Sequence, residues 1–319
     1  MTAARPLRIG TRASALALWQ ARHVAALVSA QSGAPAVELV HIRTEGDVRT
    51  DVPLWSVGGR AFFTKEIDRA LLAGEVDIAV HSLKDLSTVL EKGMVLAAAL
   101  EREDPRDALV SRDGSALSDL PKGARVGTSS LRRRAFLARN RPDVVQVELR
   151  GNVPTRVERL KKGDYDAIIL ASAGLRRLGL EAHITQSLPP DLFPPAVSQG
   201  IIGVCARFDD ADTRRWLQAL DNSGARLAAT AERALLRRLE GGCQVPLGAL
   251  GSLSGSTLNL HAAVCALNGS KMLQAEGACP ASVENAAALG QRLAEELLNK
   301  GAADLIAQER GARREVQEP

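Results

Sequence analysis

The stretch ARVGTSSLRRRAFLARNRPDVVQVELR, residues 124–150, contains one complete unit of the expected fold. Its apolar runs ARVGT and VVQVEL have the length of buried strands, and SLRRRAFLARN between them has apolar residues at helical spacing. A strand, a helix and a second strand in this order favour a parallel strand pair with the helix packed across it. The stretch therefore predicts α/β architecture with mainly parallel sheets.

The same rhythm extends over the first two-thirds of the chain. We expect strands at 7–11, 37–42, 76–81, 94–100, 107–111, 124–128, 144–149, 166–171 and 201–208, with helices at 14–30, 64–74, 130–140 and 154–163. After residue 221 the pattern changes to a helix, three antiparallel strands and a final helix, which is typical of a smaller α+β domain.

These elements predict two doubly wound lobes, like those of periplasmic binding proteins, with a cleft between them and ligands at the carboxyl ends of the strands. We expect the first lobe to comprise residues 1–100 and 200–220, and the second to comprise 101–199. The C-terminal α+β domain would then be 221–319. The chain would cross between the lobes near 101–105 and again near 194–200, where prolines stiffen it.

Composition excludes several classes of protein. A net charge of +4 and only 3% aromatic residues leave little for nucleic-acid binding, and no glycine-rich nucleotide motif stands between a strand and a helix. No apolar run is long enough to span a membrane, and MTAARPLRIG lacks the apolar core of a signal peptide, so we expect a cytoplasmic protein. The four cysteines form no C-x-x-C pair, which predicts reduced thiols and no metal site.

Arginines follow four of the predicted strands. In GTSSLRRR a strand ends and a helix begins, so backbone N–H groups, serine hydroxyls and guanidinium groups converge as in an anion site. LRGNVPTR, ASAGLRRLGL and GTRASALALWQ repeat the arrangement with Arg150, Arg156, Arg176, Arg177 and Arg12. If all four strand ends meet at the same edge, they predict a polyanionic ligand. The alternative for GTSSLRRR is a serine-capped surface helix whose arginines are solvated.

One carboxylate stands among these cations. VDIAVHSLKD ends a strand with Ser82, Lys84 and Asp85. In a basic site an ionised aspartate can accept N–H bonds and stabilise a developing positive charge, so Asp85 is the predicted catalytic residue. In isolation it would be a turn former.

Cys243 lies in LEGGCQVP, directly after a helix expected to stop at Gly241 and Gly242. The partial negative charge of a helix C-terminus and the neighbouring Glu240 disfavour a thiolate there. A cysteine hydrolase would also need a histidine base, and none of the five histidines has a partner at useful spacing. The residues around Cys243 therefore do not favour an ordinary nucleophilic cysteine.

Together these stretches resemble the porphobilinogen deaminase family almost from end to end. The shared motifs, in the family's order, are TRASALALWQ, HSLKD, EREDPRDA, VGTSSLRRR, LRGNVPTR, YDAIILASAGLRRLGL, PAVSQG and LEGGCQVP. The resemblance implies hydroxymethylbilane synthesis, in which four porphobilinogen molecules are condensed onto a dipyrromethane cofactor with release of ammonia. Hydrolysis then frees the linear product. It also implies a monomer whose product passes to uroporphyrinogen-III synthase.

The resemblance assigns roles residue by residue. Cys243 would carry the dipyrromethane through a thioether, and Asp85 would contact pyrrole N–H groups. The cofactor would be held by Ser82, Lys84, Asp85, Ser130, Arg132 and Arg133. The carboxylates of the substrate and growing chain would be bound by Arg12, Ser14, Gln20, Arg150, Arg156, Arg177 and Gln199.

Three positions depart from the family pattern. Arg60 and Ala61 stand where the family commonly has Lys and Gly, and Ser198 stands where Gly is usual. These departures concern loop and hinge motion rather than the chemistry. A non-catalytic, two-lobed anion-binding protein is the alternative function, because such proteins share the strand and helix rhythm.

Overall fold

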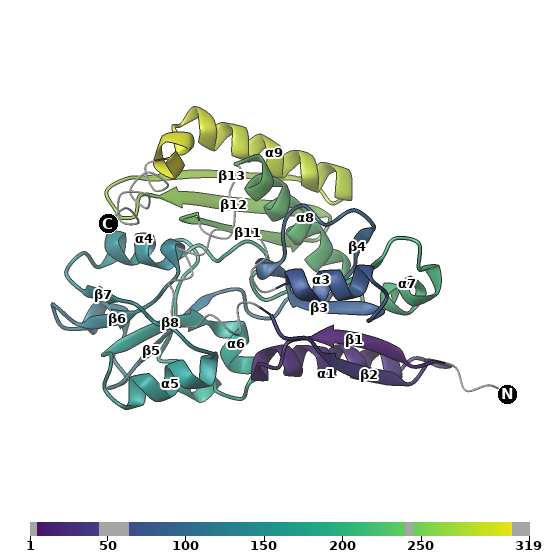
Figure 1. The fold of residues 1–319 in the computed structure, drawn as a ribbon. Coiled ribbons are helices and arrows are strands. Elements are labelled where there is room, and N and C mark those ends of the chain that lie inside the picture. The colour runs from purple at the N-terminus through teal and green to yellow at the C-terminus, as the bar shows by residue number, and fades with distance from the viewer. Residues whose placement is uncertain (1–4, 45–63, 240–244, 308–319) are drawn as a thin grey trace, which may run out of the picture. The chain divides into compact units, whose positions relative to one another are not determined.

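The computed structural model describes residues 5–44, 64–239 and 245–307 (Figure 1). The described chain divides into two compact units. Unit 1 comprises 5–44, 64–103 and 200–226, and unit 2 comprises 104–199, 227–239 and 245–307. The unit boundaries fall between Glu103 and Asp104 and between Gln199 and Gly200, inside the two stretches expected to cross. The three-domain division stays a prediction.

Unit 1 is built on a five-stranded sheet. Its strands, in sheet order, are β2 (Val37–His41), β1 (Leu7–Thr11), β3 (Ile78–Ser82), β10 (Ile202–Arg207) and β4 (Met94–Ala99). β1 pairs parallel with β2 and β3, whereas β10 is antiparallel to both β3 and β4. The expectation of a mainly parallel sheet is therefore wrong. β10 enters this sheet only after the chain has passed through residues 104–199, so no βαβ crossover fixes its direction.

Helices cover both faces of this sheet, which makes it doubly wound as expected. They are α1 (Ala15–Ser29), α3 (Lys65–Leu72) and α7 (Ala211–Gln218). Val24 of α1 and Leu217 of α7 share one buried cluster with Val80 and Val204 of the sheet. α3 packs on the opposite face, where a Cβ at Gly10 would lie only 3.1 Å from Ile67 Cγ2. The absence of a side chain there lets the helix approach β1.

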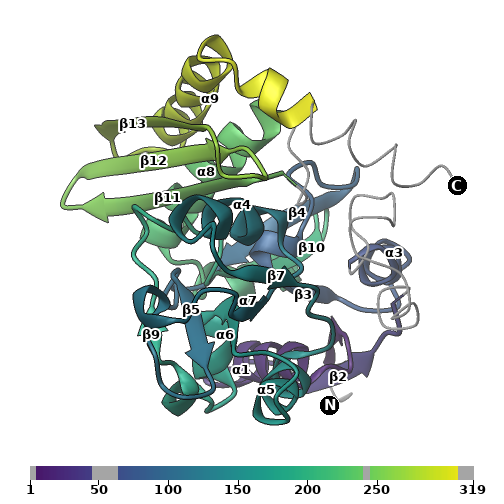
Figure 2. The same cartoon turned by 90° about the vertical axis from the view of Figure 1, so that its left-hand side faces the viewer.

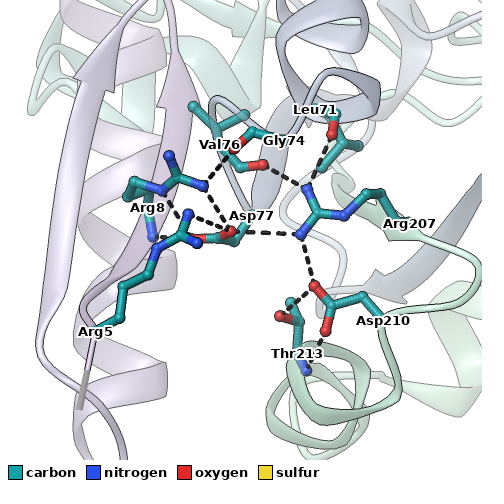
Figure 3. A network of polar contacts seen from close by, with 9 residues as sticks. All are labelled: Arg5, Arg8, Leu71, Gly74, Val76, Asp77, Arg207, Asp210 and Thr213. Carbon is teal, nitrogen blue, oxygen red and sulfur yellow. Dashed lines mark hydrogen bonds and ion pairs between the residues drawn. The ribbon is translucent and has the colours of Figure 1, made fainter.

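A polar network ties together the ends of β1, β3 and β10 opposite the carboxyl end of β3 (Figure 3). Asp77 accepts hydrogen bonds from the backbone N of Arg8 at 2.9 Å and from its Nε at 3.1 Å. The guanidinium groups of Arg5 and Arg207 also reach Asp77, each at 3.4 Å, and Arg207 continues to Asp210 at 2.7 Å. The network fixes the start of β3, whose other end holds Ser82.

Unit 2 contains a second five-stranded sheet. Its strands, in sheet order, are β7 (Val145–Val147), β6 (Arg125–Gly127), β8 (Ala167–Ala171), β5 (Asp107–Ser111) and β9 (Gln186–Ser187). β6 is parallel to β7 and β8, and β5 is antiparallel to β8 and β9, so this sheet is mixed as well. The short β9 was not expected from the sequence.

Helices also cover both faces of the second sheet. They are α4 (Leu131–Asn140), α5 (Val153–Lys161) and α6 (Ser172–Arg177). Phe136 of α4 packs with Ile169 on one face, whereas Leu160 of α5 and Leu175 of α6 pack with Ile168 on the other. Neighbouring residues of β8 point to opposite faces, so its apolar run AIILA serves both cores.

The third sheet of the chain is antiparallel and also belongs to unit 2. It contains β11 (Leu247–Ser254), β12 (Thr257–Cys265) and β13 (Met272–Pro280). α8 (Ser223–Arg238) and α9 (Val283–Asn299) cover one face, with Leu235 and Leu293 in the shared core. The other face lies against α4, where Cys265 packs with Ala135 (Figure 2).

Ser198 has an unusual backbone conformation. It is the one residue other than glycine in the described ranges with a positive φ, at 62°, and it is fully buried. Its backbone N donates to Glu232 Oε2 at 2.5 Å, and Glu232 Oε1 accepts from the N of Gly251 at 2.7 Å. The buried carboxylate thus holds the segment before Gln199 against α8 and β11.

Candidate active site

The first group of predicted site residues lies at one edge of the unit 1 sheet. β1 and β3 are parallel neighbours, so the residues that follow them come to the same edge. Arg12 and Ser14 follow β1, and Lys84 and Asp85 follow β3. Ser14 caps α1 by accepting a hydrogen bond from Ala17 N at 3.4 Å. The topology therefore brings these predicted residues together at the strand ends.

Ser82 and Gln20 contact each other directly. Gln20 Nε2 donates to Ser82 Oγ at 2.9 Å, and the Gln20 side chain is almost completely buried. Gln20 is predicted to contact substrate, and in the structure it is a buried partner of Ser82. Its contact with substrate stays a prediction, whereas its contact with Ser82 is a structural fact.

Asp85 ends a short 3₁₀ turn, Leu83–Asp85. Leu83 is fully buried, and its N donates to Ile201 O at 3.0 Å, so the turn is anchored to the strand beside it. Lys84 and Asp85 are half-buried. Within residues 5–44, 64–239 and 245–307, no hydrogen bond or ion pair engages the Asp85 carboxylate. A half-buried carboxylate of this kind can accept N–H bonds from a ligand.

The second group of predicted residues lies at an edge of the unit 2 sheet. β7, β6 and β8 are parallel neighbours, so their carboxyl ends share this edge. Arg150 follows β7, Ser130 follows β6 and Arg177 follows β8. The expectation that all four arginine-bearing strand ends share one edge is wrong, because Arg12 follows β1 in the unit 1 sheet.

Arg132 and Arg133 begin α4 and are both more than nine-tenths buried. Arg132 Nη1 lies 2.6 Å from Asp107 Oδ2, and Arg133 Nη2 lies 2.8 Å from Asp107 Oδ1. The alternative of a surface helix with solvated arginines is therefore wrong for these two residues. Ser130 caps the helix, as its position predicts, by accepting from the N of Arg133 at 3.4 Å.

Electrostatics explain how these charges remain buried. Complete burial by itself would raise the pKa of Asp107, but the charges and hydrogen bonds of Arg132 and Arg133 hold this pKa well below its usual range. Burial lowers the pKa of Arg133, and the Asp107 carboxylate opposes that shift. Asp107 therefore stays ionised and compensates part of the positive charge of the two arginines.

Further positive charge gathers beside Arg133. Arg156 lies in the first turn of α5, where it donates to Gly151 O at 2.7 Å. Its burial and the neighbouring charges of Arg133 and Arg150 lower the pKa of Arg156 to about 10. Guanidinium groups that raise the cost of each other's charge form a site for anions, since a bound carboxylate would relieve their repulsion. This group meets the requirement of a ligand with several carboxylates.

Two other predicted residues are also buried. Arg177, in α6, is 9% exposed. Gln199 is almost fully buried, and its Nε2 donates to Pro105 O at 2.8 Å and to Asp107 Oδ1 at 2.9 Å. The predicted contacts of Arg177 and Gln199 with substrate carboxylates stay predictions.

Asp107 was absent from the residues predicted from sequence. The signal that could have found it is DALVS, in which a charged residue opens an otherwise apolar strand. A fully buried aspartate is rare unless it is paired, so this position calls for cationic partners. Cys243, Arg60 and Ala61 lie outside the described residues, and their predicted roles rest on the sequence.

Comparison with protein families identifies the family to which the chain belongs. Residues 7–215 match the model described as "Porphobilinogen deaminase, dipyromethane cofactor binding domain", and residues 226–299 match "Porphobilinogen deaminase, C-terminal domain". The chain belongs to the porphobilinogen deaminase family.

Family membership establishes the function expected from the resemblance. The chain is an enzyme of porphyrin synthesis that converts porphobilinogen to hydroxymethylbilane with a dipyrromethane cofactor. The acetate and propionate groups of this cofactor suit the buried guanidinium groups of Arg132 and Arg133. The non-catalytic, anion-binding alternative gains no support from the family match.

The chain is also similar to several solved structures. The methionine binding protein MetQ is 14% identical, with 67% of this chain and 89% of that chain covered and a TM-score of 0.44. A nutrient binding protein from Burkholderia cenocepacia bound to methionine is 14% identical, with 67% and 91% covered and a TM-score of 0.42. YhfZ from Shigella flexneri is 21% identical, with 72% and 94% covered and a TM-score of 0.36. Likenesses at these scores do not bear on function.

Within the described ranges, none of the helices has both the length and the apolar character that crossing a membrane requires.

Proposed function

We propose that the chain is a transferase in which Asp85 is the catalytic group and the arginines bind the carboxylates of cofactor, substrate and growing chain. The observation that carries the proposal is the group formed by Arg133, Arg150 and Arg156, in which burial of Arg156 and the charges of its two neighbours lower the pKa of Arg156 to about 10. A structural ion pair would have the opposite effect on an arginine. A bound anion would offset the positive charge of this group.

The cofactor-binding residues come from both sheet edges. Ser82 ends β3 and Lys84 follows it, whereas Ser130, Arg132 and Arg133 follow β6. Hydroxyl groups and cations are the donors that a pyrrole acetate or propionate accepts. When bound, the dipyrromethane supplies the primer to which pyrrole units are joined, and Cys243 is the proposed point of attachment.

Asp85 is assigned the charge-stabilising role. Its half-buried carboxylate can accept hydrogen bonds from pyrrole N–H groups, and it can stabilise the positive charge that develops as ammonia leaves. Partial exclusion of water strengthens both interactions. Asp85 is thus proposed to act as a fixed negative charge, while the cations hold the carboxylates.

The remaining predicted residues are assigned to the substrate and the growing chain. These residues are Arg12, Ser14, Gln20, Arg150, Arg156, Arg177 and Gln199. Action as a cytoplasmic monomer that passes its product to uroporphyrinogen-III synthase remains a prediction from the family resemblance.

The test is intact-protein mass spectrometry of the wild-type chain and of Cys243→Ala, paired with an assay of ammonia release from porphobilinogen. We expect a covalent adduct on the wild-type chain, no adduct on Cys243→Ala, and ammonia release from the wild type alone. Cys279→Ala is the matched control, because Cys279 is a free thiol on β13. An active wild-type chain without an adduct would overturn the proposal, and an inactive anion-binding chain would revive the alternative.

A further inference from the structure

We propose that Asp107 is a positioning residue for the arginines that hold the cofactor, and that Gln199 acts on them through Asp107 rather than by binding substrate. The inference rests on the proposed roles of Arg132 and Arg133. It adds a residue without a predicted function and gives Gln199 a different one.

Asp107 is the meeting point of three side chains from two segments of unit 2. Its carboxylate is fully buried and accepts from Arg132 Nη1 at 2.6 Å and Nη2 at 3.2 Å. Arg133 donates to it from Nε at 3.0 Å and Nη2 at 2.8 Å. Gln199 Nε2 adds a further bond at 2.9 Å. A carboxylate surrounded by this many donors fixes the planes of both guanidinium groups.

The bonds to Asp107 also determine which donors remain for a ligand. Arg132 uses three N–H groups, two on Asp107 and one on Pro194 O. Arg133 also uses three, two on Asp107 and one on Ile169 O. A guanidinium carries five N–H donors, so five minus three leaves about two on each arginine. Asp107 therefore directs a defined set of donors away from itself, and its single charge leaves the pair with net positive charge.

The Gln199 side chain is bonded to Asp107 and is buried, so it does not lie on the surface as a donor for substrate. It is almost fully buried, and its Nε2 donates to Pro105 O and Asp107 Oδ1. Its backbone N donates to Ala196 O at 2.9 Å, which fixes it in the turn at the end of its segment. Through Asp107, Gln199 connects this turn to the first turn of α4.

The decisive variant is Gln199→Leu, which removes the amide and leaves no charge unpaired. If Gln199 acts through Asp107, turnover should fall about tenfold while KM for porphobilinogen stays unchanged, because the misplaced arginines hold the cofactor and not the incoming substrate. A raised KM with unchanged kcat would overturn the inference, since that is the result for a residue that binds substrate.

Asp107→Asn tests the positioning residue itself. The amide keeps the shape of the carboxylate but turns an N–H group toward guanidinium donors, so we expect about 100-fold lower turnover and incomplete cofactor attachment by intact mass. The double variant Asp107→Asn/Gln199→Leu should be no slower than Asp107→Asn alone. Multiplied effects in the double variant would contradict action through Asp107. If Asp107→Asn does not fold, the KM and kcat of Gln199→Leu still decide the question.

Asp143→Asn is the matched control. Asp143 also pairs with an arginine of unit 2, at 2.8 Å from Arg141 Nε, but its carboxylate is partly exposed. We expect wild-type turnover and adduct mass for this variant. Wild-type turnover by a folded Asp107→Asn would also overturn the inference. Absence of an adduct on the wild-type chain would instead count against the proposed function, so the two failures are distinguishable.

Discussion

Gln20 Nε2 lies 2.9 Å from Ser82 Oγ, which joins a buried position of α1 to the last residue of β3. The bond spans 62 positions of sequence and fixes the Ser82 hydroxyl directly before the turn that contains Asp85. Ser82 is thereby held in one orientation before any ligand is bound. Preorganisation of this kind lowers the cost of ordering the site.

Gln20→Leu should therefore weaken cofactor binding and also lower the stability of the fold. We expect a loss of about 1 kcal/mol in the free energy of unfolding, because one buried hydrogen bond is removed. The fraction of chain that carries the adduct, measured by intact mass, should fall. Gln31→Leu is the control. Gln31 lies shortly after the end of α1, and its side chain donates a hydrogen bond to Trp216 O and not to Ser82. Equal adduct fractions in both variants would contradict the role of Gln20.

Asp85→Asn should separate cofactor attachment from turnover. The amide keeps the size of the carboxylate but not its charge, so turnover should fall by about 10²–10³-fold while the adduct remains visible by intact mass. Glu91→Gln serves as the control, because Glu91 is an exposed residue of the same unit. Near-normal ammonia release by Asp85→Asn would refute the catalytic assignment.

Arg156→Met should stabilise the cofactor-free protein and weaken anion binding. The folded-state pKa of Arg156 is lowered to about 10, so below pH 10 its charge costs stability in full. Between pH 10 and the ordinary pKa of arginine the unfolded chain binds more protons, so this group makes stability rise with pH there. At neutral pH the substitution removes the repulsion, and the melting temperature of Cys243→Ala protein should rise when Arg156→Met is added.

Arg159→Met is the matched control on the same helix. A hydrogen bond to Asp164 raises the pKa of Arg159, so its charge is stabilised in the folded state. Its removal should leave the melting temperature equal or lower, with substrate affinity unchanged. A lower melting temperature for Arg156→Met would show that the group is not electrostatically crowded.

Ser198→Gly should stabilise the chain. A φ of 62° costs a residue with a side chain about 1–2 kcal/mol, whereas glycine adopts it without strain. Glycine also loses more backbone entropy on folding, about 0.5–1 kcal/mol, so the net gain should be about 0.5–1 kcal/mol in chemical denaturation. Ser198→Ala, which keeps the strain, should be the less stable of the two variants. Equal stability of the two variants would contradict this account.

Much of the fold could be predicted because its signals are local. The strand at 107–111 and the helix ending at residue 140 agree with prediction, since apolar periodicity is contained in neighbouring residues. α7 was not predicted, because ADTRRWLQ is short and polar and buries few residues. The antiparallel direction of β10 was also missed, since it depends on a pairing with β3 more than 100 positions away.

The family, the strand ends that carry Asp85 and the arginines, and the candidacy of Cys243 as the tether follow from the sequence alone. The folded chain was needed to find that Arg132 and Arg133 share the carboxylate of Asp107, and that Gln199, 92 positions away from Asp107, joins them. The two sets of findings differ because the interactions behind them differ in range along the chain. Motifs and periodicity involve adjacent residues, whereas burial, ion pairing and pKa shifts depend on distant segments that meet only in the folded chain.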